Sequence, residues 1–202
     1  MNWKEFWNKQ ETPLNRENNK KWYKLYAGEI NLLYKLLDVK NGNVLETGCG
    51  DGQLFEHFDF IKKEYVGIDY SKSLLDRFKE AHPSINLIES DASKYKDNTK
   101  YSFIFSTGVI QYFDKQMLDE YIKNSLEMLE DGGVLLMSNI PNSLLRFSYN
   151  NGELSSKLKK RNKLKSFLIA LYVKYTKRNL GHWYRPNDFL QYGDDLDIKI
   201  FG

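Results

Sequence analysis

Short β-prone runs alternate with amphipathic helical patterns along residues 43–140, and this alternation constrains the fold more than any other feature. Strands that alternate with helices indicate a parallel sheet with helices on both faces, which is an α/β, Rossmann-like architecture. The strand patterns lie at 43–47, 64–70, 85–90, 101–108 and 134–140, and the helical ones at 51–60, 71–82 and 114–133.

The flanking residues are expected to complete a single domain over 1–202. Residues 1–40 are rich in aromatic side chains and predict an N-terminal helical cover, with its clearest helical spacing at 27–38. Residues 141–183 form a basic helical insert, and 184–202 predict a terminal helix and strand. These patterns give six strands at most.

Composition narrows the class of protein further. The formal charge of +3 on 202 residues is too small to favour nucleic acid as a partner. The one cysteine, Cys49, cannot form an intrachain disulfide, which fits a reducing compartment. No apolar run has signal-peptide form or reaches the roughly 18 residues of a membrane span. We therefore expect a cytoplasmic protein.

Glycines and polar side chains follow directly after the predicted strands. In parallel sheets, ligands bind at the carboxyl ends of strands, where the strand order reverses. Glycines there let a ligand approach the backbone, and an acid at the end of the second strand suits a ribose diol. The residues in these positions are Glu46, Gly48, Cys49, Gly50 and Gly52, then Asp69 and Tyr70, then Asp91 and Ala92, and lastly Ser106, Thr107 and Gly108.

A dinucleotide is one of the nucleotide-like ligands that fit this arrangement. A dinucleotide fingerprint needs G-x-G-x-x-G and an acid about 20 positions later, and Asp69 lies 21 positions after Gly48. However, the third glycine comes one residue early, and Asp91 has no standard role in a dinucleotide site. Taken singly, either aspartate would be explained as a turn or cap residue, and Cys49 as a small filler.

The motifs "VLETGCGDG", "VGIDYS", "IESDAS", "FIFSTGVIQYF" and "LEDGGVLLMSNI" resemble, in order and spacing, those of class I S-adenosylmethionine-dependent methyltransferases. The resemblance implies S-adenosyl-L-methionine as cofactor and S-adenosyl-L-homocysteine as product. It implies that the glycine loop and Glu46 hold the methionine part, Asp69 the ribose hydroxyls, and Asp91 with Ala92 the adenine. Ser106, Thr107 and Gly108 would line the methionine side. The family's sheet usually has seven strands with the last one antiparallel, so the resemblance implies that this chain lacks that final antiparallel strand. No metal site is predicted.

The resemblance also implies direct transfer of a methyl group, for which alignment is the main requirement. A hydroxyl acceptor could need a general base, and the candidates are His182, Tyr112 and Asp114. The N-terminal pattern resembles small bacterial methyltransferases of polysaccharide and natural-product biosynthesis, which suggests O-methylation of a small-molecule or glycan acceptor. A nicotinamide-dependent oxidoreductase and a non-catalytic binding protein with this fold are the alternatives.

Residues 157–178 carry nine basic side chains and no acidic one, with apolar residues on one helical face. Three interpretations stay open. The segment could be a lid helix, a peripheral membrane contact that would suit a lipid-linked glycan, or a site for an acidic partner. Its aromatic residues are too sparse for a nucleic-acid stacking platform.

Overall fold

A computed structural model gives the fold and describes residues 7, 16–60, 64–150, 181–193 and 197–200. The chain divides into two compact units, residues 1–138 and 139–202, each described by itself. The basic insert predicted at 141–183 lies mostly outside the described residues. The membrane contact predicted at 157–178 lies wholly outside them.

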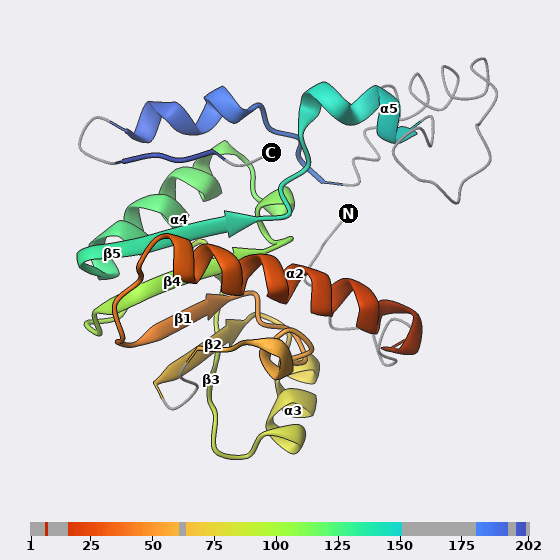
Figure 1. Ribbon diagram of the computed structural model, residues 1–202, viewed down its shortest axis with the longest axis vertical. Coiled ribbons are helices and arrows are strands. Elements are labelled where there is room, and N and C mark those ends of the chain that lie inside the picture. The colour runs from red at the N-terminus through yellow and green to blue at the C-terminus, as the bar shows by residue number, and fades with distance from the viewer. Residues whose placement is uncertain (1–6, 8–15, 61–63, 151–180, 194–196, 201–202) are drawn as a thin grey trace. The chain divides into compact units, whose positions relative to one another are not determined.

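The first unit is built on a five-stranded, wholly parallel sheet in the order β3-β2-β1-β4-β5 (Figure 1). This order confirms the predicted α/β fold, because each crossover returns the chain to the same end of the sheet. The strands are β1 (Val44–Thr47), β2 (Tyr65–Asp69), β3 (Asn86–Glu89), β4 (Tyr101–Thr107) and β5 (Leu129–Ser138).

Helices cover both faces of this sheet (Figure 1). Side chains alternate between the faces of a strand, so Phe103 and Phe105 of β4 share one face. There they contact Phe60 and, for Phe103, also Tyr34 of α2 (Arg16–Leu36). On the other face, Thr47 of β1 meets Tyr121 of α4 (Lys115–Met128) at 2.9 Å between hydroxyl oxygens. The third helix, α3 (Lys72–Ala81), packs beside β2 and β3.

The helix predicted at 51–60 is wrong, because only a short 3-10 helix, η1 (Phe55–His57), forms there. Contacts from α2 explain the difference. The Asn31 side chain accepts from the Asp59 N–H at 3.0 Å and donates to the His57 carbonyl at 2.9 Å. Since these backbone groups are bonded to Asn31, the segment ends against α2 instead of continuing as a helix.

The predicted end of the helix at Gly132-Gly133 is also wrong. Helix α4 ends at Met128, and both glycines lie inside β5. The pairing of β4 with β5 has a register shift between Tyr101 and Phe103. A Cβ on Gly133 would lie 3.0 Å from the Tyr101 carbonyl oxygen, so this irregular pairing needs glycine for a close backbone approach.

Over its described residues, the second unit contains the short helices η3 (Ser143–Leu145), α5 (Arg146–Asn150) and η4 (Pro186–Tyr192). The helix predicted near 185–193 is therefore present but is of the 3-10 type. The strand predicted at 196–201 is not formed over the described residues 197–200. One parallel bridge joins Asn142 to Tyr184.

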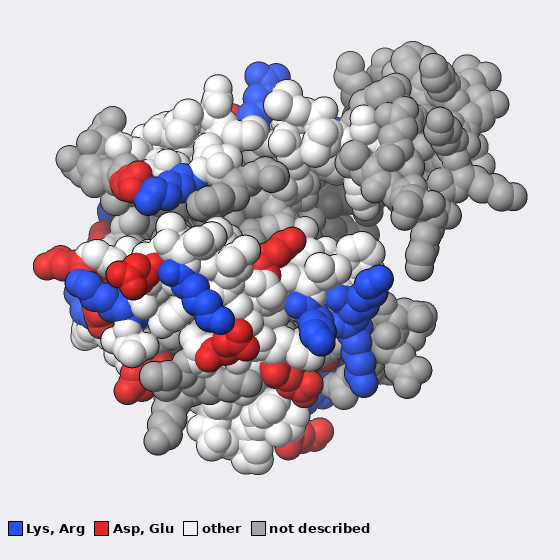
Figure 2. Space-filling model, in the orientation of Figure 1, with Lys and Arg blue, Asp and Glu red and all other residues white. Residues whose placement is uncertain are grey.

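The described surface mixes charges of both signs, and Lys, Arg, Asp and Glu are interspersed over the face seen in Figure 2. Within the described ranges, the structure contains no helix long and apolar enough to cross a membrane.

A buried carboxyl group, that of Glu46, lies inside the sheet layer. Glu46 is 2% exposed and accepts a hydrogen bond from the hydroxyl of Tyr65, which is 2% exposed. Burial raises the pKa of Glu46 from its ordinary 4.5 to about 8, opposed by the Tyr65 hydrogen bond. The folded protein therefore holds a proton between these pH values that the unfolded chain has released.

We predict that the free energy of unfolding falls as pH rises from 5 to 8, and that Glu46→Gln flattens this dependence. Glutamine keeps an acceptor for Tyr65 but does not titrate, and one such group contributes at most about 1.4 kcal/mol per pH unit. Urea unfolding at pH 5, 6, 7 and 8 measures the slope. The exposed α2 variant Glu29→Gln should keep the wild-type slope; equal slopes for wild type and Glu46→Gln would contradict the prediction.

We also predict that Gly52→Ala destabilises the protein by about 2–4 kcal/mol. Gly52 has φ +78°, and a Cβ there would lie 2.5 Å from the buried Phe78 ring. As a matched control, Gly28→Ala places a methyl group in open space on α2 and should stabilise by about 0.5–1 kcal/mol. Thermal unfolding of both variants tests this, and equal Tm values would refute it.

Candidate active site

The candidate site lies at the carboxyl ends of the strands, around the loop that follows β1. Because β1 pairs with β2 on one side and β4 on the other, the chain leaves β1 where the strand order reverses. This is the position at which open α/β sheets bind their ligands. The predicted residues after β1, β2, β3 and β4 are thus brought to the same edge of the sheet.

The glycine loop is tight on one side and open on the other. The Gly48 N–H donates to the Ile68 carbonyl at 2.7 Å, and a Cβ on Gly48 would lie 2.2 Å from the Val109 side chain. Gly50 has φ +56° but no heavy atom within 4 Å of its Cβ position. A ligand can therefore approach the backbone at Gly50, whereas Gly48 is required by packing.

Asp69 braces this loop as well as ending β2. One carboxylate oxygen accepts from the Gly50 N–H at 3.0 Å, and the other accepts from the Ser71 N–H at 2.8 Å. Burial raises the pKa of Asp69 above its ordinary value, and the Ser71 and Gly50 donors oppose that rise. Each carboxylate oxygen has two lone pairs, so acceptor capacity remains for hydroxyl groups such as those of a ribose.

Asp91 lies in the turn after β3, close to the end of β2. Its Oδ1 accepts from the Ser93 N–H at 2.9 Å and from the Ser93 hydroxyl at 2.7 Å, while the neighbouring Ala92 is buried. Burial raises the pKa of Tyr70, with further contributions from the charges of Asp69 and Asp91. The predicted residues after β2 and β3 therefore form one cluster.

The residues after β4 connect that strand to the end of β5. Ser106 is fully buried, and the Thr107 hydroxyl lies 3.0 Å from the hydroxyl of Ser138. Gly108 has φ +67° and donates its N–H to the Ser138 carbonyl at 3.1 Å. These contacts fix the backbone on the side of the glycine loop opposite Asp69.

Glu46 and Cys49 are placed differently from the other predicted residues. The Glu46 carboxyl group points into the core toward Tyr65, and its predicted contact with a methionine amino group stays a prediction. Cys49 is 6% exposed and packs against Gly67, where a Cβ would come 2.9 Å from the sulfur. Burial raises the pKa of this thiol, which suits a packing role more than a nucleophile.

The three candidate bases differ in their surroundings. Tyr112 follows β4, and burial raises the pKa of its phenol, which disfavours proton abstraction at neutral pH. Asp114 caps α4 by accepting from the Met117 N–H at 2.9 Å. His182 is exposed in the second unit.

Trp7 is a residue that the sequence placed in the N-terminal cover but not in the site. Its carbonyl accepts from the Ser71 hydroxyl at 3.4 Å, and its ring meets that of Tyr112 edge-on, with 6.1 Å between centroids. Ser71 follows β2 and Tyr112 follows β4, so Trp7 contacts both sides of the glycine loop. Trp7 lies among other aromatic residues of the segment 1–40, so its sequence pattern indicates the cover and does not single it out for the site.

Among the described residues, no group of three His, Cys, Asp or Glu side chains is arranged to hold a metal ion.

Comparison with known proteins supports the same interpretation. Residues 44–133 match the family model described as "Methyltransferase domain". A ubiquinone biosynthesis O-methyltransferase from Pelagibacter ubique (strain HTCC1062) is 26% identical over 116 residues, which are 55% of this chain and 47% of that protein.

Two solved structures show the same fold. An S-adenosylmethionine-dependent methyltransferase from Clostridium acetobutylicum ATCC 824 superposes with a TM-score of 0.56 and 24% identity, covering 64% of this chain and 55% of the other. An amino pentose methyltransferase from Micromonospora echinaspora gives a TM-score of 0.51 and 18% identity, covering 56% and 50%. The chain thus matches only about half the length of these proteins.

The matched residues 44–133 contain the glycine loop, Asp69, Asp91 and the whole of β4, which are the elements that form the site. The predicted family and fold class are confirmed, and S-adenosyl-L-methionine is the cofactor of this class. For residues 44–133, the comparisons thus support the class I S-adenosylmethionine-dependent methyltransferase family.

Proposed function

We propose that this protein transfers a methyl group from S-adenosyl-L-methionine to a hydroxyl group of a small-molecule or glycan acceptor. The observation that carries the proposal is the pair of carboxylates, Asp69 and Asp91, at neighbouring strand ends beside the open backbone of Gly50. A ribose diol, an adenine amino group and a methionine chain need acceptors and backbone access in this arrangement.

The residues present fit that cofactor. Gly50 offers a backbone position with space beside it, and a side chain there would occupy that space. Asp69 can accept from ribose hydroxyls with the lone pairs that its two backbone bonds leave. Asp91 uses Oδ1 for both Ser93 donors, so Oδ2 suits an adenine amino group. Thr107 and Gly108 follow β4, the strand next to β1 on the side opposite β2, where they would line the methionine part.

The bound cofactor supplies an electrophilic methyl group on a positively charged sulfur. The chain then contributes mainly position, since holding donor and acceptor in line can lower the barrier by roughly 7–11 kcal/mol. Burial raises the pKa of Tyr112. This side chain therefore suits a hydrogen-bonding or packing contact to the acceptor more than proton abstraction. His182, an exposed imidazole, and Asp114, a carboxylate, stay the candidate bases on their side-chain chemistry alone.

The acceptor class rests on two lines of support. The curated relative named above is an O-methyltransferase, and one structural neighbour methylates an amino pentose. These names describe those proteins, and the fold likeness to the second is at low identity. We propose O-methylation, with a sugar or phenolic hydroxyl as the acceptor to be tried first.

We predict that calorimetry detects binding of S-adenosylmethionine and S-adenosylhomocysteine, but not NAD, to the intact chain. Asp69→Ala should lower the affinity for both adenosyl ligands by about 10–100-fold, because a hydrogen bond to a charged group contributes about 1.5–3 kcal/mol. Asp76→Ala, which removes an exposed carboxylate on α3, is the matched control and should bind as wild type.

Since Asp69 also braces the loop, circular dichroism must first show that Asp69→Ala is folded. Binding of NAD with no binding of either adenosyl compound would overturn the proposal in favour of an oxidoreductase. Adenosyl binding without formation of S-adenosylhomocysteine, across a panel of sugar and phenolic acceptors, would favour a non-catalytic protein.

A further inference from the structure

We propose that Asn124 of α4 is a positioning residue for Asp91, acting through Ser93, and that it thereby sets recognition of the adenine amino group. This inference rests on the proposed function, because it concerns the cofactor site. Asn124 lies on α4, which packs against the connection between β3 and β4, and not at the end of a strand.

The turn after β3 holds Asp91 in a fixed geometry. The Asp91 carbonyl accepts from the N–H groups of Lys94 and Tyr95 at 3.0 and 2.9 Å. Its carboxylate Oδ1 accepts from both the N–H and the hydroxyl of Ser93, which is fully buried. Two donors from one buried residue therefore fix the rotation of the carboxylate and leave Oδ2 as the oxygen that suits an adenine amino group.

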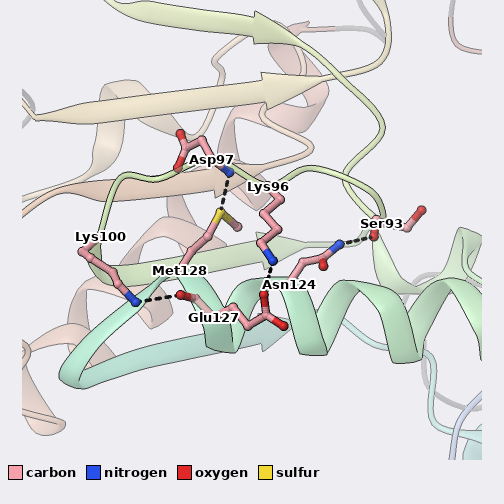
Figure 3. Close-up of polar contacts among 7 residues, drawn as sticks. All are labelled: Ser93, Lys96, Asp97, Lys100, Asn124, Glu127 and Met128. Carbon is pink, nitrogen blue, oxygen red and sulfur yellow. Dashed lines mark hydrogen bonds and ion pairs between the residues drawn. The ribbon is translucent and has the colours of Figure 1, made fainter.

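A side chain of α4 contacts that turn. The Asn124 side-chain N–H donates to the Ser93 carbonyl at 3.2 Å (Figure 3). Ser93 is therefore held on both sides: its donors face Asp91 and its carbonyl faces Asn124. If Ser93 shifts, the carboxylate of Asp91 loses the geometry that its two bonds impose.

Other contacts between the same elements hold a different part of the connection (Figure 3). The Lys100 side chain donates to the Glu127 carbonyl at 2.7 Å, and the Asp97 N–H lies 3.4 Å from the Met128 sulfur. Lys96 pairs with Glu127, but their side chains are 54% and 41% exposed, so solvent screens that pair. These contacts fix residues 96–100 to the end of α4, whereas Asn124 reaches the turn itself.

The experiment compares two ligands in calorimetry. One is S-adenosylhomocysteine, and the other is its purine analogue with hydrogen in place of the adenine 6-amino group. Asn124→Ala should lower the affinity for S-adenosylhomocysteine by about 3–10-fold, which is the effect of losing one neutral hydrogen bond. The affinity for the purine analogue should fall by less than about 2-fold. A purely structural role would weaken both ligands equally.

Two further variants sharpen the test. Asp91→Ala should remove the wild-type preference for the amino compound, and adding Asn124→Ala to it should produce no additional loss. Gln116→Ala removes another amide of α4, that of an exposed residue bonded to Glu120 one turn along, and this variant should bind both ligands as wild type does.

Each result decides the inference. Equal weakening of both ligands by Asn124→Ala, or no weakening of either, overturns it while leaving the proposed function intact. Wild-type protein that binds both ligands equally overturns the adenine role of Asp91 and the inference with it. Wild-type protein that binds neither ligand overturns the proposed function itself.

Discussion

The parallel pairing of β1 with β2 on one side and with β4 on the other determines where every part of the site lies. Because β1 lies between β2 and β4, the loop that follows β1 leaves the sheet between the carboxyl ends of these two strands. The loop is then constrained by Val109 after β4 and by Asp69 at the end of β2. Of the loop glycines Gly48, Gly50 and Gly52, Gly50 is the one whose Cβ position has no heavy atom within 4 Å, so we expect a ligand to approach the backbone there.

The strands and the strand-end acids could be predicted because their signals are local. Each of β1 to β4 lies inside an apolar, β-prone run, and the residue types that end these runs mark the edge of the sheet. Once the strands are parallel, Asp69 and Asp91 must lie at the same edge, whatever the loops between them do. Two of their hydrogen-bond partners, Ser71 and Ser93, follow from short turns near in sequence. Gly50 lies 19 residues from Asp69, and the pairing of β1 with β2 brings the two together.

The predictions that proved wrong depend on contacts between residues far apart in sequence. Asn31 of α2 binds the backbone at His57 and Asp59, which ends the helix expected after the glycine loop. The irregular pairing of Tyr101 places Gly133 inside β5, although two adjacent glycines are typical of a helix end. Neither partner is visible in a local pattern. The same is true of Asn124, which lies 31 residues from the carbonyl it binds.

The acids of the site are arranged before a ligand arrives, and this arrangement has an energetic consequence. Asp69 is buried and already bonded to two backbone N–H groups, so much of the cost of taking its charge out of water is met during folding. A ribose hydroxyl that reaches it enters a low-dielectric environment, where each hydrogen bond is stronger than in water. Asp91 is fixed in the same manner by Ser93. If S-adenosylmethionine binds as proposed, neither carboxylate would need to be ordered on binding, and both would attract the positive charge of the cofactor.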